Sequence, residues 1–425
     1  MSELNTMPRE ELTALHAKLR ARFDRFRQAG MRLDLTRGKP CPEQLDLANP
    51  MLTVVGSDSF RAADGSDCRN YGGLDGLPEA KSLFAAYLGV EPTEVIIGGN
   101  ASLTLMYDLF MRLMLMGAGD GQPPWSQLPR VRFLCPSPGY DRHFAICANL
   151  GIEMLPVEMT GAGPDMDAVE DLVAEDDTIK GIWCVPIYSN PTGEIYSDDT
   201  VSRLARMTTR AADFRIFWDN AYAVHQFSGD PPEQKNILAA CTEAGHPERP
   251  LMFGSTSKIT FAGGGLAILA GSARNMDWVR QQLFYQTIGP DKLNQLRHVR
   301  FFGDLDGIKR HMQKHAAIVR PRFEAVESIL TRELAGRGVA DWTRPQGGYF
   351  VSFNAPDGCA RAVVAMAAEA GVKLTPAGAT FPLGVDPRDR NIRIAPTFAA
   401  LEDVQAAVEV LAVCTQMVSI EKILL

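Results

Sequence analysis

The sequence has few cysteines, and none of them lies in a pattern typical of a metal site or a disulfide framework. Its 425 residues include eight cysteines, which lie singly at positions 41, 68, 135, 147, 184, 241, 359 and 414. Among the seven histidines, the one pair with metal-ligand spacing is His311 and His315, and we interpret their basic segment as a solvated helix face. The sequence therefore predicts no metal site and favours a reducing compartment, the cytoplasm.

Long apolar runs and an excess of positive charge are also absent. No run approaches the ~18 residues of a membrane span, and the N-terminal stretch is charged and helical rather than a signal peptide. The formal net charge of −8 argues against a general affinity for nucleic acid or for anionic membranes. With 46% hydrophobic and 22% charged residues, the composition is that of an ordinary globular protein.

Short apolar runs alternate with amphipathic segments from about residue 52 to 300. Strands are predicted at 94–99, 131–136, 153–159, 181–188, 214–220, 251–256 and 267–272. Helices are predicted at 103–117, 141–151, 165–176 and 199–212. Such alternation is typical of a mostly parallel sheet covered by helices on both faces. We therefore predict an α/β fold with a three-layer α/β/α large domain at residues 52–300.

A different pattern follows the long helical stretch that begins at residue 301. Strands are predicted at 342–354 and 391–398, with a helix at 360–371 between them and a closing helix at 401–414. This order is typical of a smaller α+β domain. We expect residues 301–425 to form it together with residues 1–51.

Lys258 is the only cation in residues 253–272, among hydroxyl, glycine and alkyl side chains. It could lie on a surface loop, with its stem along apolar surface and its ammonium in water. Alternatively, a desolvated lysine has a lowered pKa and becomes an amine nucleophile that can form a Schiff base. This segment by itself leaves both readings open.

Polar residues follow other predicted strands, at the sheet edge where ligands of α/β proteins bind. Asp219 could cap a helix or hold a proton on a ligand nitrogen. Tyr222 could pack in the core or share that ligand's site. Asn190, in the turn sequence N-P-T-G, could also donate its amide to a ligand oxygen.

Three more segments suggest ligand contacts. Residues 98–102 join a strand to a long helix, and their free N–H groups could bind an anion, unless Asn100 or Ser102 simply caps the helix. Tyr140 could present its ring to a flat heterocycle. Arg393 lies among apolar neighbours and needs a carboxylate partner, from the protein or from a substrate.

Taken in order, these segments resemble the fold-type I aminotransferases that use pyridoxal 5′-phosphate, over about residues 33 to 400. The segments T-S-K-I-T-F-A-G-G-G and T-R-G-K-P are similar to a divergent aspartate-aminotransferase-like subgroup, sometimes labelled MocR-related. The resemblance implies amino transfer between an L-amino acid, with aspartate a candidate, and a 2-oxo acid such as 2-oxoglutarate. It also implies a homodimer with the active site at the subunit interface.

The resemblance further implies a role for each side chain. Lys258 would form a Schiff base with the cofactor, and Asp219 would pair with its protonated ring nitrogen. Tyr222 and Asn190 would hydrogen-bond its phenolic oxygen, while Tyr140 would stack on the ring. The residues implied to bind the phosphate are Gly99, Asn100, Ala101, Ser102, Ser255 and, from the neighbouring subunit, Tyr71. Those implied to bind the substrate are Arg393, Gly38 and Asn190.

One position departs from the family pattern. Members commonly carry a phosphate-binding arginine eight residues after the lysine, where this chain has Leu266. Hydroxyls and backbone amides, or another cation, must then take its place. A dicarboxylate substrate would need a second cation for its distal group, and Arg37, Lys39 and Arg297 are equal candidates.

Two alternatives to an aminotransferase remain at this point. A lyase acting at Cβ could use the same scaffold and cofactor. A transcriptional regulator that senses an amino acid or the cofactor would need a winged-helix module of roughly 60 residues or more before the domain. About 30 residues precede L-D-L-T-R-G-K-P, and they predict one amphipathic helix, which favours the enzyme.

Overall fold

The computed structural model describes residues 3–119 and 121–425, and its largest sheet has seven strands in the order β2-β8-β7-β6-β5-β3-β4. Neighbouring strands are parallel except for β8, which runs antiparallel to both β2 and β7. The predicted α/β class with a mostly parallel sheet is thus confirmed. The strands are β2 (Val95–Ile97), β3 (Arg132–Ser137), β4 (Glu153–Glu158), β5 (Ile179–Cys184), β6 (Arg215–Asp219), β7 (Pro250–Ser255) and β8 (Ala267–Gly271).

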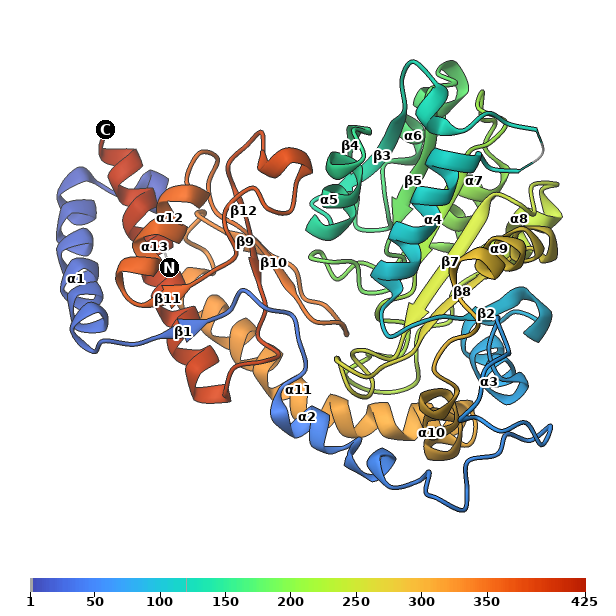
Figure 1. Ribbon diagram of the computed structural model, residues 1–425. Helices are drawn as coiled ribbons and strands as arrows, with labels where there is room; N and C mark the ends of the chain where they lie inside the picture. The colour runs from blue at the N-terminus through green and yellow to red at the C-terminus, as the bar shows by residue number, and fades with distance from the viewer. Residues whose placement is uncertain (1–2, 120) are drawn as a thin grey trace.

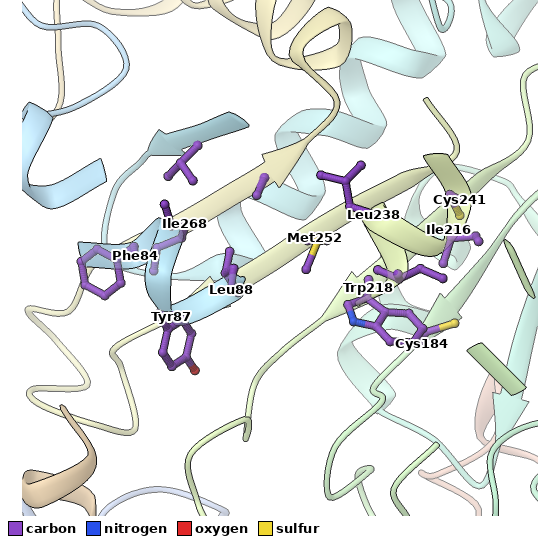
Figure 2. Packing of buried hydrophobic residues seen from close by; sticks show 14 of the residues in the cluster. Phe84, Tyr87, Leu88, Cys184, Ile216, Trp218, Leu238, Cys241, Met252 and Ile268 are labelled. Carbon is purple, nitrogen blue, oxygen red and sulfur yellow. The ribbon is translucent and has the colours of Figure 1, made fainter. Parts of the chain in front are cut away.

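Both faces of this sheet are covered, because successive strand residues point to opposite sides. In β6, Trp218 packs into the hydrophobic cluster drawn in Figure 2, whereas Phe217 packs into a second cluster on the other face. The first face is covered by α3 (Pro78–Leu88), α6 (Met166–Glu175), α7 (Asp198–Arg206), α8 (Ile237–Glu243) and α10 (Lys292–Phe302). The second is covered by α4 (Ser102–Met116), α5 (Asp141–Asn149) and α9 (Ala273–Gln286).

A smaller α+β part lies beside this three-layer part, at the left of Figure 1. Its antiparallel sheet has the order β12-β10-β9, and a parallel pair joins β1 to β11. Its strands are β1 (Leu33–Asp34), β9 (Asp341–Trp342), β10 (Val351–Asn354), β11 (Val372–Lys373) and β12 (Asn391–Ile394). Its helices are α1 (Arg9–Gln28), α2 (Pro42–Asp46), α11 (Leu305–Leu334), α12 (Ala360–Glu369) and α13 (Leu401–Leu424). Short 3-10 helices lie at Leu4–Thr6, Asn49–Leu52, Pro92–Glu94, Trp125–Gln127 and Pro382–Gly384.

Several elements of this part differ from their predicted bounds, and β12 ends at Ile394 instead of residue 398. The strand predicted at 342–354 is divided into β9 and β10 by a turn in which Gly348 has a φ of +85°. The closing helix continues to Leu424 instead of ending at residue 414, and most of this extension is buried. A helix buried on most sides lacks the polar face that marks a boundary in sequence.

Helix α11 contacts both parts, as Figure 1 shows along its lower edge. Ile308 and Met312, near its start, belong to the hydrophobic cluster of the large sheet. Val319 and Phe323, further along, belong to the cluster shared by α1, α12 and α13. The division into domains near residue 300 therefore stays a prediction.

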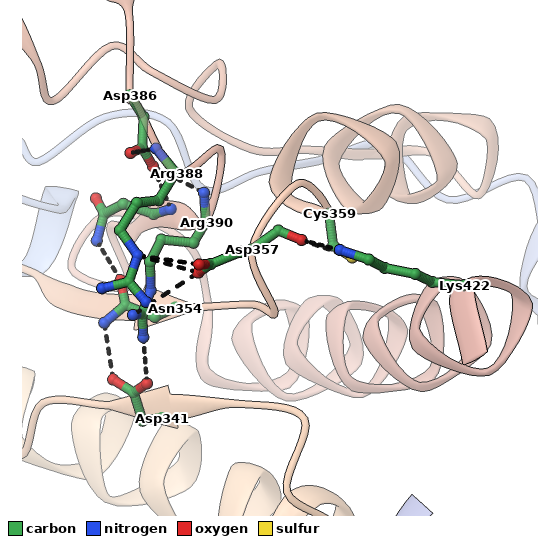
Figure 3. A network of polar contacts seen from close by, with 9 residues as sticks. Asp341, Asn354, Asp357, Cys359, Asp386, Arg388, Arg390 and Lys422 are labelled. Atoms are coloured by element: carbon green, nitrogen blue, oxygen red, sulfur yellow. Dashed lines mark hydrogen bonds and ion pairs between the residues drawn. The ribbon is translucent and has the colours of Figure 1, made fainter. Parts of the chain in front are cut away.

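A polar network fixes the chain just before β12 (Figure 3). The Asp386 carboxylate accepts hydrogen bonds from the backbone N–H groups of Arg388 at 2.9 Å and Arg390 at 2.8 Å. The Arg388 guanidinium in turn pairs with Asp357 at 3.1 Å. The network sets the position at which β12 starts, and this strand carries Arg393.

Within residues 3–119 and 121–425, no helix has both the length and the hydropathy to cross a membrane.

Candidate active site

Three of the side chains singled out in the sequence lie at the carboxyl ends of β5, β6 and β7. Asp219 ends β6, and Lys258 follows β7. Asn190 follows β5, and its side-chain oxygen lies 3.3 Å from Arg393 Nη1, which comes from β12 of the smaller part. Parallel strands end at one edge of a sheet, which is where ligands of such folds bind.

Asp219 is a buried carboxylate, and one of its two oxygens has no hydrogen-bond partner among the described residues. Its side chain hydrogen-bonds through Oδ2 to His143 Nε2 at 3.2 Å, while Oδ1 is buried and has no hydrogen-bond partner among the described residues. It caps no helix, because it is the last residue of β6 and its polar contact is to a side chain. A buried carboxylate oxygen is costly unless a cation or a donor reaches it, so Asp219 is suited to hold a proton on a ligand nitrogen.

His143 is a site residue that the sequence analysis missed. Its ring stacks on Trp183 with 4.1 Å between centroids and 7° between planes, which orients its Nε2 toward Asp219. His143 follows Tyr140 by three residues, so one turn of α5 brings both rings to the same side. That spacing was the available signal.

Lys258 is only partly exposed, and its amine lies near an aromatic ring. Its Nζ is 4.8 Å from the ring centroid of Tyr222. Burial lowers the Lys258 pKa, and the nearby Asp219 charge acts in the opposite direction. An amine whose pKa is lowered by desolvation is a better nucleophile at neutral pH. The geometry therefore favours the nucleophile reading over the surface-loop reading.

The backbone around Lys258 is held by buried polar side chains. The Lys258 carbonyl lies 3.3 Å from His225 Nε2 and accepts a hydrogen bond from the Tyr349 hydroxyl at 3.4 Å. Burial lowers the pKa of His225 to about 3, with the Lys258 charge a smaller cause. The neutral imidazole thus helps to fix the lysine loop at neutral pH.

The interpretation of His311 and His315 as a solvated face is wrong, because both are buried. His311 Nε2 lies 2.7 Å from the Ile259 carbonyl, and the two rings are joined by a 3.0 Å contact between Nε2 atoms. Gln44 Nε2 lies 2.9 Å from His315 Nδ1. Residues four apart share one helix face, so α11 turns both imidazoles toward the lysine loop while its basic residues point elsewhere.

Tyr222 and Tyr140 each pack against another aromatic ring of the site. Tyr222 is buried and packs beside Tyr349, with ring centroids 5.8 Å apart. The Tyr140 ring meets His143 edge-on at 4.8 Å, and burial raises the pKa of Tyr140 to about 12. Both phenols therefore stay protonated at neutral pH and can donate hydrogen bonds.

The start of α4 has open backbone N–H groups. Its N-cap is Ala101, which makes no side-chain cap bond, so the plain capping by Asn100 or Ser102 is not what the structure has. Ser257 Oγ donates to the Asn100 carbonyl at 2.8 Å and so ties this loop to the lysine loop. Ser255 ends β7, and its Oγ accepts a hydrogen bond from the Ser257 N–H at 3.4 Å. Free N–H groups at a helix start with hydroxyls beside them suit a phosphate.

Leu266, at the position of the family's arginine, belongs to the hydrophobic core. It is buried in the cluster of the large sheet, and its backbone N–H donates to Thr256 Oγ1 at 2.8 Å. The Leu266 N–H group is therefore already occupied, and this position offers an anion no cation.

Arg393 is buried and has both a carboxylate and an amide beside it. Nη1 lies 2.8 Å from Asp141 Oδ1 and 3.3 Å from Asn190 Oδ1, and the guanidinium carbon is 4.9 Å from the centroid of the Phe350 ring. A Cβ on Gly38 would lie 2.2 Å from Phe350 Cζ, so the Gly38 backbone lies against the same ring. Asp141, which is 252 residues away in the chain, was not among the predicted site residues.

The remaining candidates are the two cations that flank Gly38, a third cation on α10, and Tyr71. Arg37 is exposed, and Lys39 places its ammonium 3.7 Å from the centroid of the Phe398 ring. Arg297 has a buried Nε with no partner among the described residues. Tyr71 is 82% exposed, and its loop is anchored by Lys292 Nζ, which donates to the Tyr71 carbonyl at 3.0 Å.

Comparisons with known proteins agree over nearly the whole chain. The model of the aspartate amino-transferase family matches residues 7–425. A protein of Mycolicibacterium smegmatis, provisionally named an aminotransferase, is 49% identical over 99% of this chain and 98% of its own. An aspartate aminotransferase of Corynebacterium glutamicum is 44% identical over 97% of this chain and 95% of its own. A crystal structure of an aspartate transaminase from the same species superposes with a TM-score of 0.97, at 43% identity and 99% coverage of both chains.

Proposed function

We infer, from the premise that the chain belongs to the aspartate amino-transferase family and is an aminotransferase, that it works with pyridoxal 5′-phosphate. We propose that it moves an amino group between an L-amino acid, aspartate first among the candidates, and a 2-oxo acid such as 2-oxoglutarate. The observation that carries the proposal is the buried, unpartnered Oδ1 of Asp219 in the same site as the Lys258 amine.

The residues of the site fit this cofactor. Asp219 would hold a proton on the ring nitrogen, since its open oxygen needs a positively charged donor. His143 would keep that carboxylate in place. Tyr222 and Asn190 would reach the ring's phenolic oxygen, and Tyr140 would lie against the ring face.

The phosphate would be held by the start of α4 and the adjoining loop. The open N–H groups of residues 99–102 and the Ser255 hydroxyl would supply donors in place of the arginine that Leu266 replaces. A phosphate bound through amides and hydroxyls needs no guanidinium at that position.

When bound, pyridoxal phosphate supplies an electron sink for the bonding electrons of the substrate's Cα. Lys258 would attach the cofactor covalently and later move a proton at Cα, as its lowered pKa permits. Arg393, with the Gly38 backbone and Asn190, would bind the α-carboxylate and so orient the Cα–H bond.

We further propose a homodimer with the active site at its interface. Large apolar side chains are exposed on the loop before α3 and around the end of α9: Tyr71, Phe284, Tyr285 and Ile288. Exposed apolar groups of this kind are typical of surfaces that pair. Sedimentation of the purified protein tests the assembly, and a monomer at micromolar concentration would contradict it.

The cytoplasm is the compartment that we propose. All eight cysteines are free and buried, which suits a reducing environment.

Amino-donor profiling with 2-oxoglutarate as acceptor tests the proposed substrates. We expect glutamate to form with aspartate as donor, and the preparation to need pyridoxal phosphate for full activity. Transfer from other donors but not from aspartate would overturn the substrate assignment alone. Full activity in a protein free of pyridoxal phosphate would overturn the cofactor.

A further inference from the structure

Both N–H groups of Arg393 Nη1 have partners within the protein. One points to Asp141 Oδ1 at 2.8 Å and the other to Asn190 Oδ1 at 3.3 Å. Asp141 belongs to the first turn of α5 in the large part, and Arg393 belongs to β12 in the small part. The ion pair thus joins the two parts directly beside Tyr140.

A carboxylate from solvent can bind this guanidinium through two hydrogen bonds. Two parallel hydrogen bonds to a carboxylate come either from the two Nη atoms or from Nε and one Nη. The Nε atom has no partner among the described residues, whereas Nη1 already has two. A carboxylate that binds through both Nη atoms therefore has to replace one of the two partners of Nη1.

Of the two partners of Arg393, Asp141 is the one that can be displaced. Its side chain is 37% exposed, against 8% for Arg393, so its carboxylate can turn into water at small cost. Asn190 is buried in a turn that is closed by the Gly193 N–H donating to the Ser189 carbonyl at 2.6 Å. Two carboxylates at one guanidinium also repel each other, which favours exchange over sharing.

We propose that Asp141 is an internal competitor for the carboxylate site of Arg393 and sets the affinity for every substrate carboxylate that binds there. In the free enzyme it neutralises the guanidinium and holds the small part to the large part, and an arriving carboxylate displaces it. The proposal rests on the role of Arg393 proposed above. Asp141 acts through Arg393 and sets substrate affinity, without touching the reacting atoms.

Asp141→Asn tests the competition because it removes the charge and keeps the shape. We expect the KM of each amino and 2-oxo acid to fall by about three- to tenfold, as one competing charge near the protein surface allows, with kcat within about twofold. Succinate has neither an amino nor an oxo group, and we expect its Kd for the holoenzyme, measured calorimetrically, to fall in parallel.

A matched control separates competition from a structural ion pair. Asp167 also lies in the first helical turn, of α6, and pairs with Arg203 at 2.5 Å away from the site. Asp167→Asn should leave KM and the succinate Kd unchanged. A lowered Tm for Asp141→Asn, without a change in either quantity, would show that the pair is merely structural and would overturn the proposal.

Two other outcomes also overturn it. A higher KM in Asp141→Asn would show that Asp141 holds Arg393 in its binding position instead of competing. If Arg393→Lys left every KM unchanged while the enzyme still transferred amino groups, the role of Arg393 would fail, and the competition with it. Should Asp141→Asn not fold, Asp141→Ser serves the same comparison, because it too removes the charge.

Discussion

The two sides of the site are built differently. On the β6–β7 side, Asp219, His143 and the Lys258 loop are each held by neighbours of low exposure. The β12 side contacts the large part through Arg393, which pairs with the partly exposed Asp141. The first side has the rigidity that a permanently bound group requires, and the second has an exchangeable contact suited to ligands that come and go.

Replacing Lys258 should remove the function of the β6–β7 side of the site. We expect Lys258→Ala to abolish amino transfer, because no other described side chain in the site offers a desolvated amine of lowered pKa. The adduct formed with pyridoxal phosphate and borohydride should also disappear, as peptide mapping would show. Persistence of that adduct on another lysine would contradict the assignment.

Asp219→Asn keeps the shape of the side chain at this position and removes its negative charge. Amino transfer should fall by orders of magnitude, since a neutral amide cannot hold the proton on a ring nitrogen, while the Tm stays close to that of the wild type. Rate measurements at saturating substrate decide the point. A loss smaller than about tenfold, equivalent to ~1.4 kcal/mol, would remove Asp219 from catalysis.

Arg393→Lys acts on the second side alone. Lysine keeps the charge but loses the paired donors, so the KM of all substrates should rise by about ten- to a hundredfold, or ~1.5–3 kcal/mol. Cofactor binding, followed by absorbance, should stay intact. Unchanged affinity with a lower Tm would instead identify the pair with Asp141 as structural.

The smallest effect is expected for His315, beneath the lysine loop. Burial, with the nearby His311 charge a smaller cause, lowers its pKa to about 3 in the folded chain, against an ordinary value of 6.5. The stability that this neutral imidazole contributes is present above pH 6.5 and is lost as the pH falls toward 3. The loss at pH 5 is about 2 kcal/mol. In His315→Gln, the Tm should therefore fall less steeply between pH 7 and 5 than in the wild type. Equal slopes would contradict the buried, neutral state.

Much of the β6–β7 side could be predicted from the sequence. Asp219, Lys258 and Asn190 each follow a short apolar run whose strand character is local, and the carboxyl ends of parallel strands meet at one edge. The strand bounds matched to within a few residues for the same reason. His143 was missed although its spacing from Tyr140 marks one helical turn.

Contacts across the two parts could not be predicted in this way. Asp141 and Arg393 are 252 residues apart, and neither segment shows which residue the other will meet. The burial of His311 and His315 depends likewise on where α11 crosses the lysine loop. A basic helix segment has the same local pattern whether its apolar face is covered by another element or left in water.

The sequence by itself determined the elements, the α/β class and the order of the chemical groups at the strand ends. These follow from the periodicity of apolar residues and from turn residues that act over a few positions. Only the tertiary structure decided that Asp219 keeps one oxygen open, that two histidines support the lysine loop and that Asp141 pairs with Arg393. Those facts depend on side chains brought together from distant segments, where burial and charge are set by packing rather than by neighbours in the chain.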